Sequence, residues 1–277
     1  MSFLIEAFEP TFMQRALVGS LIAVIATSLV GTWIVLRGLA FLGDALAHGV
    51  IPGVALAVLW GFNPALGAFL SALVMSGLVT FVSNRTTVRD DTAIGLLFVG
   101  MLALGVVIVS KSGSFKTEVT VILFGDALGI TRGDIQNQII YTSIVVVLTV
   151  LLYRPFLALT FNQMKAQTLG MRPRLSQAAL LGLLSLSIVA SFQSIGTLLV
   201  FGLLVAPPAT ASLLVKRVPL IMAVSILLGS LAVVAGLTIS FHYGTAGGAT
   251  MAGISVLLFF VVLLGQTVVN SLYKLRT

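Results

Sequence analysis

Long runs of apolar residues, separated by short polar segments, dominate this chain. A helix needs about 20 mostly apolar residues to cross a hydrocarbon core of roughly 30 Å. Nine runs approach or exceed that length and predict membrane-spanning helices. The alternation over about ten residues that marks a membrane β-barrel strand is not visible in the sequence. The predicted spans are residues 12–36, 40–61, 64–83, 92–110, 134–153, 176–192, 197–215, 219–241 and 250–272.

A tenth apolar stretch, Glu118–Ile130, is short and is interrupted by Gly125, Asp126 and Gly129. We expect a re-entrant or half-buried helix there, because the stretch is too short to cross a bilayer. No connection between the other runs has room for a separate domain. The sequence therefore predicts an all-α polytopic membrane protein with about nine transmembrane helices plus one short re-entrant helix. Residues 1–277 are expected to form a single transmembrane domain.

The composition supports this fold class. Of the 277 residues, 58% are hydrophobic and 8% are charged, about a third of the charge that a soluble domain carries. Such a chain cannot cover a water-soluble surface, and it is not disordered, because disordered chains are polar. The net charge of +7 does not indicate nucleic-acid binding, since Lys and Arg occur in ones and twos between apolar runs. The lack of cysteine excludes disulfides, thiolate catalysis and cysteine-ligated metal sites.

The cationic residues predict an orientation, because cytoplasmic loops carry an excess of Lys and Arg. With the C-terminus in the cytoplasm and the N-terminus outside, 11 cations fall inside and 4 outside. The inner set is Arg37, Arg85, Arg89, Arg154, Lys165, Arg172, Arg174, Lys216, Arg217, Lys274 and Arg276, and the outer set is Arg15, Lys111, Lys116 and Arg132.

One acidic residue of the eight stands apart from the others, which lie in predicted loops or at helix ends. Asp44 lies near the start of the predicted span 40–61, and His48 follows four residues later, so both side chains project from one helix face. A carboxylate costs about 2.5–3.5 kcal/mol at the centre of a bilayer and less near its edges. Glycines and Pro52 surround the pair. Because proline removes an intrahelical hydrogen bond, we expect the helix to kink there.

Three interpretations of this pair remain open on the residues alone. The two side chains can satisfy each other, or a neighbouring helix, in a purely structural role. They can form a proton relay of the kind found in pumps. They can also line a cation pathway, because carboxylate and imidazole together suit zinc, manganese or ferrous iron. We favour the cation pathway. One chain supplies only two such ligands, whereas a symmetric pair of chains would supply four.

Two further segments bear on function. The polar connection Arg154–Leu175 is long enough for one or two short helices at the cytoplasmic face. The complete P-loop motif that ATP hydrolysis would require is absent, so the chain is not expected to be an enzyme.

Pro207 and Pro208 lie inside the predicted span 197–215 and are expected to break its hydrogen bonding. A broken helix is tolerated at membrane depth only inside a bundle or beside a cavity, which predicts an interior position.

Five segments carry a family resemblance: Arg37–Gly53, Asp91–Gly95, Leu102–Val106, Gln193–Val200 and Leu203–Pro207. They resemble the motifs of permease subunits of ABC importers for zinc, manganese or iron. The resemblance implies a type II ABC importer-like bundle in the plasma membrane of a prokaryote. It also implies three partners: a second copy of the permease, a cytoplasmic ABC ATPase and an extracytoplasmic metal-binding protein. The metal would be cargo rather than a resident cofactor.

The resemblance further implies roles for individual residues. Asp44 and His48 would lie on the metal route. A loop that docks into the ATPase would contain Phe161, Asn162, Ala166 and Gly170, with Asn162 standing where the family usually has aspartate. An Asp-x-Pro motif that the family usually has on the outer side is replaced here by residues 244–248. Two alternatives are a self-contained proton-coupled metal carrier and an ABC permease for a metal chelate or vitamin.

Overall fold

The computed structural model describes residues 6–85, 90–110, 129–161 and 172–274, and over these residues the chain forms helices and no strand. The predicted re-entrant helix lies largely in residues 111–128, outside the described residues. The helices are α2 (Thr11–Leu36), α3 (Ala40–Gly49), α4 (Ile51–Trp60), α5 (Pro64–Arg85), α6 (Asp90–Val109), α8 (Arg132–Leu151), α9 (Tyr153–Phe161), α11 (Pro173–Ile195), α12 (Thr197–Leu214), α13 (Val218–Tyr243) and α14 (Gly247–Lys274).

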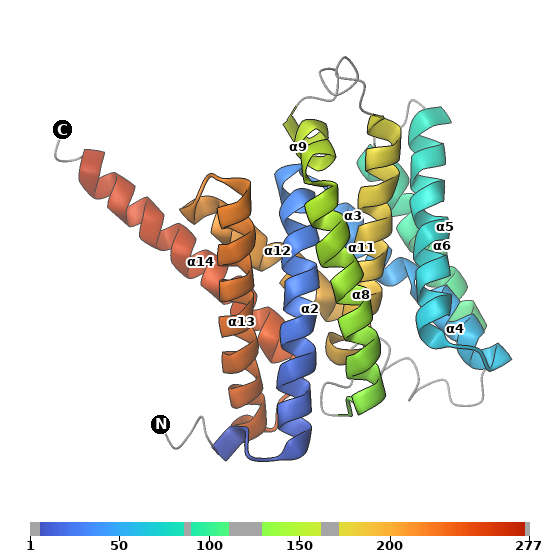
Figure 1. The fold of residues 1–277 in the computed structure, drawn as a ribbon, viewed down its shortest axis with the longest axis horizontal. Helices are drawn as coiled ribbons and strands as arrows, with labels where there is room; N and C mark the ends of the chain where they lie inside the picture. The colour runs from blue at the N-terminus through green and yellow to red at the C-terminus, as the bar shows by residue number, and fades with distance from the viewer. Residues whose placement is uncertain (1–5, 86–89, 111–128, 162–171, 275–277) are drawn as a thin grey trace.

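The nine predicted crossings coincide with helical segments of this bundle, each within a few residues of its predicted ends. Within the described residues, eight segments are long and apolar enough to cross a membrane, with α3 and α4 counted together as one. The ninth is α12, whose apolar stretch over Val200–Leu214 is shorter. The long helices run alternately up and down across the bundle, so connections collect at two opposite ends (Figure 1). The all-α polytopic fold class is confirmed.

The helix α2 lies at the centre of the bundle and packs against α8, α11, α12 and α13 (Figure 1). Small residues permit this central position because they let neighbouring backbones approach closely. A Cβ atom at Gly31 would lie only 1.9 Å from the carbonyl oxygen of Leu204 on α12. Glycine is therefore the residue that the contact between α2 and α12 requires.

The helix α12 continues through Pro207 and Pro208, so the expected break in hydrogen bonding does not end the helix. The prolines remove two backbone N–H donors, so the carbonyls of Leu203 and Leu204 lose their regular helical partners. Those carbonyls belong to buried residues, and the close approach of α2 covers the second of them. Packing against neighbouring helices thus maintains a helix that the local sequence would interrupt. The predicted interior position of this helix is confirmed by its burial.

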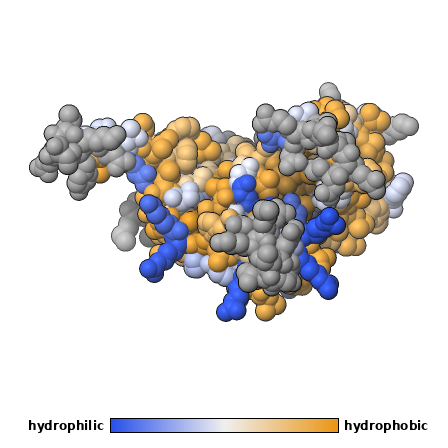
Figure 2. Space-filling view, turned by 90° about the horizontal axis from the view of Figure 1, so that it is seen from above, coloured by the Kyte–Doolittle hydropathy of each residue, from blue (hydrophilic) through white to orange (hydrophobic). Residues whose placement is uncertain are grey.

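A short helix occurs where the polar connection predicted one. The helix α9 follows α8 directly, and its residues Tyr153 and Phe156 pack edge-on against Trp33 of α2, with ring centroids 5.5 and 5.7 Å apart. Five exposed cations lie at the ends of helices on this same side of the bundle (Figure 1). Figure 2, which looks onto this end, shows hydrophilic side chains projecting around its margin. The five are Arg154, Arg172, Arg174, Lys216 and Arg217.

Candidate functional site

At the predicted kink beside the acidic residue, the span is interrupted at Val50, between two helices. The helix α3 ends at Gly49 and α4 begins at Ile51, with Pro52 in its first turn. The last carbonyl groups of a helix lack intrahelical partners. One of them, the Gly49 carbonyl, accepts a hydrogen bond of 2.6 Å from the hydroxyl of Ser71 on α5. A neighbouring helix therefore satisfies the backbone at the break.

Close backbone contacts hold the segment after the break in place. A Cβ atom at Gly53 would lie 2.0 Å from the carbonyl oxygen of Gly67, and a Cβ at Gly67 would lie 2.3 Å from that of Gly53. The helices α4 and α5 thus touch through two glycines. On α6, a Cβ at Gly105 would lie 3.2 Å from the backbone nitrogen of Pro52. The break is therefore packed from two sides. Of the eight candidate spans in the described residues, Ala40–Trp60 has the largest share of buried residues, 78% of its apolar 18-residue window.

Asp44 and His48 lie one turn apart on α3, as the sequence predicted. The Nδ1 atom of His48 lies 3.7 Å from the Asp44 carboxylate and 3.0 Å from the Asp44 backbone carbonyl. A carbonyl only accepts, so Nδ1 carries the hydrogen and donates it to this oxygen. In the neutral ring the lone pair is then on Nε2, the arrangement common in metal-binding histidines. The carboxylate distance is too long for a good hydrogen bond.

The two side chains differ in exposure. The Asp44 side chain is 27% exposed and the His48 side chain 11% exposed. His48 also packs against Phe98 of α6 with ring centroids 5.0 Å apart and an angle of 83° between the rings. The backbone bond and the aromatic contact together fix the imidazole orientation. The carboxylate has no such restraint from the described residues.

The sequence did not single out Ser71 or Phe98. Both act across helices: Ser71 reaches the break from α5, and Phe98 reaches the imidazole from α6. Hydroxyl and phenyl groups are common in membrane helices, so their spacing along the chain carries no signal for such contacts. Phe98 lies one turn beyond the Asp91–Gly95 motif, and this motif is a hint that α6 borders the site.

By itself the pair would be an incomplete metal site. Among the described residues, no group of three or more His, Asp or Glu side chains is close enough to hold a metal ion. His242, at the far end of α13, directs its Nδ1 atom to the carbonyl of Thr238 at 2.9 Å. One carboxylate oxygen and one imidazole nitrogen can bind a divalent cation weakly. They leave most of its coordination positions to water or to another chain.

The residues predicted to contact an ATPase lie mostly beyond what the structure describes. Phe161 ends α9, and it is 69% exposed. Asn162, Ala166 and Gly170 lie outside the described residues. On the same side of the bundle, the Nη2 atom of Arg37 donates a hydrogen bond of 2.7 Å to Oε1 of Gln177. Burial lowers the pKa of Arg37, because desolvation disfavours its charged form. This bond joins the end of α2 to the first turns of α11.

A bundle of membrane-crossing helices, with an acid and an imidazole on a buried and interrupted span, defines a polytopic membrane protein. The chain belongs to the ABC 3 transport family, whose model matches residues 9–266. It is 33% identical over 264 residues to the manganese transport system membrane protein MntC of Listeria monocytogenes, covering 95% of this chain and 94% of that protein. It is 36% identical over 250 residues to the manganese import system permease protein ScaB of Streptococcus parasanguinis, covering 90% and 89%.

The fold agrees with a solved relative. A chain of the structure of PsaBC from Streptococcus pneumoniae in complex with Fab superposes with a TM-score of 0.86. That chain is 29% identical in sequence, and the match covers 94% of each chain. The predicted family of zinc, manganese and iron ABC importer permeases is therefore confirmed.

Proposed function

We propose that this chain is the membrane-spanning subunit of an ATP-driven importer that carries a divalent first-row transition metal into the cytoplasm. Manganese is the first candidate, because both relatives described above are named for manganese, and zinc and ferrous iron are the others. The observation that carries the proposal is the Asp44–His48 pair on the broken helix. A carboxylate and an imidazole with its Nε2 lone pair suit all three metals.

The proposed mechanism uses the pair as a transient binding site. A metal ion delivered from an extracytoplasmic binding protein would be held by the Asp44 carboxylate and Nε2 of His48. A second copy of the chain would contribute the same two ligands across a symmetry axis. Either chain alone would supply only two ligands, fewer than the four that close a structural zinc site.

Energy for the cycle would come from a separate ABC ATPase on the cytoplasmic side. The end of α9 and the loop after it are the proposed docking element, because Phe161 is exposed there. The Arg37–Gln177 bond would link movement at the start of α11 to the end of α2, immediately before α3. The orientation with the N-terminus outside remains part of this proposal.

The proposal is tested by uptake into proteoliposomes that contain the permease with its partner ATPase. We expect Asp44→Asn and His48→Gln to abolish most ATP-dependent manganese uptake while leaving thermal stability and ATPase binding intact. Glu9→Gln is the matched control, because this exposed acid precedes α2 and is remote from the pair. Undiminished uptake by both site variants would restrict the pair to a structural role.

A second comparison tests the energy source and the cargo. Uptake that continues in ATP-depleted vesicles, without a P-loop partner, would favour a self-contained carrier. The elemental content of cells with and without the chain, grown in metal-limited medium, identifies the metal. A loss of manganese alone supports the first candidate, and a loss of zinc or iron alone reassigns the cargo.

A further inference from the structure

An apolar groove of about 510 Å³ lies between α5, α8 and α11. Its rim includes Leu66 and Ile144, which are 55% and 42% exposed, so the groove opens sideways onto the apolar surface that faces the membrane. No charged side chain lines it among the residues that the structure describes. The lining residues are Ala65, Leu66, Phe69, Tyr141, Ile144, Leu148, Leu152, Ala179, Gly182, Leu183, Leu186 and Val189.

One end of the groove runs toward a group of exposed arginines. Leu152 lines the groove at the end of α8, and Arg154 follows two residues later in α9. Two more arginines, Arg172 and Arg174, flank the first residue of α11, and Ala179 of the same helix lines the groove. All three arginines are exposed, and α9 packs against both α8 and α11. Apolar lining therefore passes into a cationic surface at this end of the bundle.

The length and lining of the groove suit an apolar occupant. On α8 the lining extends from Tyr141 to Leu152, about 16 Å at 1.5 Å per residue. A hydrocarbon chain lying along the groove would match this length and chemistry. Basic residues beside membrane helices attract anionic lipid headgroups.

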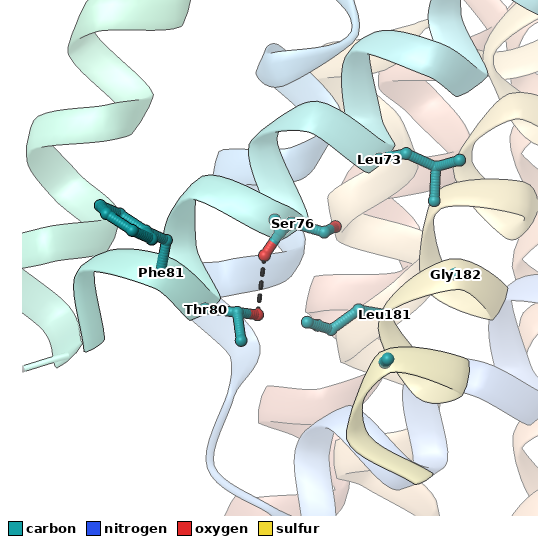
Figure 3. Close-up of a pocket in the computed structure, with 8 residues that line it drawn as sticks. Leu73, Ser76, Thr80, Phe81, Leu181 and Gly182 are labelled. Atoms are coloured by element: carbon teal, nitrogen blue, oxygen red, sulfur yellow. Dashed lines mark hydrogen bonds between the residues drawn. The ribbon is translucent and has the colours of Figure 1, made fainter. Parts of the chain in front are cut away.

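A neighbouring groove of about 490 Å³ between α5 and α11 differs in chemistry (Figure 3). It includes the hydroxyl residues Ser76 and Thr80, and the Thr80 hydroxyl donates a hydrogen bond of 2.8 Å to the Ser76 carbonyl. Gly182 lines both grooves, whereas Gly77 lines only this second one. A larger side chain at Gly77 would therefore alter only the second groove, whereas one at Gly182 would alter both.

We propose that the groove between α5, α8 and α11 binds an acyl chain of an anionic phospholipid whose headgroup contacts Arg154, Arg172 and Arg174. The chain fills the apolar groove, and the arginines select a negative headgroup over a zwitterionic one. The proposal concerns a surface apart from the Asp44–His48 pair, and it is tested without metal or ATP. Its failure would therefore leave the proposed transport function untouched.

The test places a tryptophan reporter in the groove and measures its quenching by brominated lipids. Ile144→Trp is combined with Trp60→Phe, because Trp60 is 72% exposed and would add background, whereas Trp33 is fully buried. The protein is reconstituted in bilayers of phosphatidylcholine with increasing dibrominated phosphatidylglycerol or dibrominated phosphatidylcholine. We expect phosphatidylglycerol to bind about fivefold more strongly for each arginine engaged.

Four variants locate the effect. Combined Arg154→Gln, Arg172→Gln and Arg174→Gln should remove the preference, and the corresponding lysine variants should keep it. Gly182→Leu should lower quenching of the reporter by filling the groove, and Gly77→Leu should not. A Cβ at either glycine meets no atom within 4 Å, so both variants are expected to fold.

Equal quenching by the two lipids would overturn the proposal, and so would a preference that survives loss of the arginines. A reporter shielded from every brominated lipid would also overturn it, because a protein segment would then occupy the groove. A second measurement avoids the reporter altogether. In native mass spectrometry, the unmodified chain should retain more phosphatidylglycerol than phosphatidylcholine. The triple glutamine variant should retain the two lipids equally.

Discussion

Replacing Gly67 by alanine should separate the two helices that hold the break in place. The added Cβ would lie 2.3 Å from the Gly53 carbonyl oxygen, whereas ordinary contacts begin at 3.4 Å, so α4 must move by about 1.1 Å. Overpacking of this kind costs about 1–3 kcal/mol. Alanine also favours a helix over glycine by up to about 1 kcal/mol, which offsets part of the cost.

The same substitution at Gly77 isolates the steric effect. Gly77 lies in the same helix, α5, and a Cβ there meets no atom within 4 Å. Helix propensity then cancels between the two variants, so Gly67→Ala should be less stable than Gly77→Ala by about 1–3 kcal/mol. Displacement of α4 should also reach the Asp44–His48 pair, because α4 begins three residues after His48.

Two assays measure these effects. Thermal unfolding in detergent, followed by size-exclusion chromatography, gives the order of stability of the two variants. ATP-dependent manganese uptake in proteoliposomes should fall for Gly67→Ala and stay unchanged for Gly77→Ala. Equal stability of the two variants would refute the close contact between α4 and α5. Reduced stability with normal uptake would refute its connection to the site.

Three further substitutions test neighbouring contacts. Ser71→Ala leaves the Gly49 carbonyl without its donor and should lower stability by about 0.6–1.7 kcal/mol in thermal unfolding; an unaltered melting temperature would show that the bond is dispensable. Phe98→Leu removes the edge-on contact with His48 and should raise the KM for metal uptake about two- to tenfold, an expectation that an unchanged KM would contradict. Gly31→Ala places a methyl group 1.9 Å from a carbonyl oxygen of α12 and should destabilise the bundle by about 1–3 kcal/mol, so a normal unfolding curve would argue against that helix contact.

The helices of this protein could be predicted from sequence because their signal is local. A run of apolar residues of sufficient length has few structures available to it in a membrane, so the spans and their approximate ends follow from hydropathy. The same locality explains why the sequence could not show that the helix continues through Pro207 and Pro208. Proline weakens its own helix, but the outcome here depends on burial and on the approach of α2 at Gly31, residues far away in sequence.

The candidate site also has features that local sequence predicts and features that it does not. The four-residue spacing places Asp44 and His48 on one face of a helix, and Pro52 marks a discontinuity beside them, so both features could be predicted. The contacts made by Ser71 and Phe98 could not, because they depend on which helix faces which. Small residues signal close packing in general without naming the partner.

If Asp44 and His48 bind a metal ion as proposed, their geometry suits a site that must also release it. The imidazole is held in one orientation by the Asp44 carbonyl and by Phe98, so little rotational freedom remains to be lost when an ion arrives. The Asp44 carboxylate lies 3.7 Å from the imidazole and is 27% exposed, so it can exchange the ion with water or with another ligand. An oriented imidazole beside a less restrained carboxylate would therefore favour fast capture and fast release of a metal ion. A third or fourth fixed ligand on the same chain would bind the ion more tightly and slow its release.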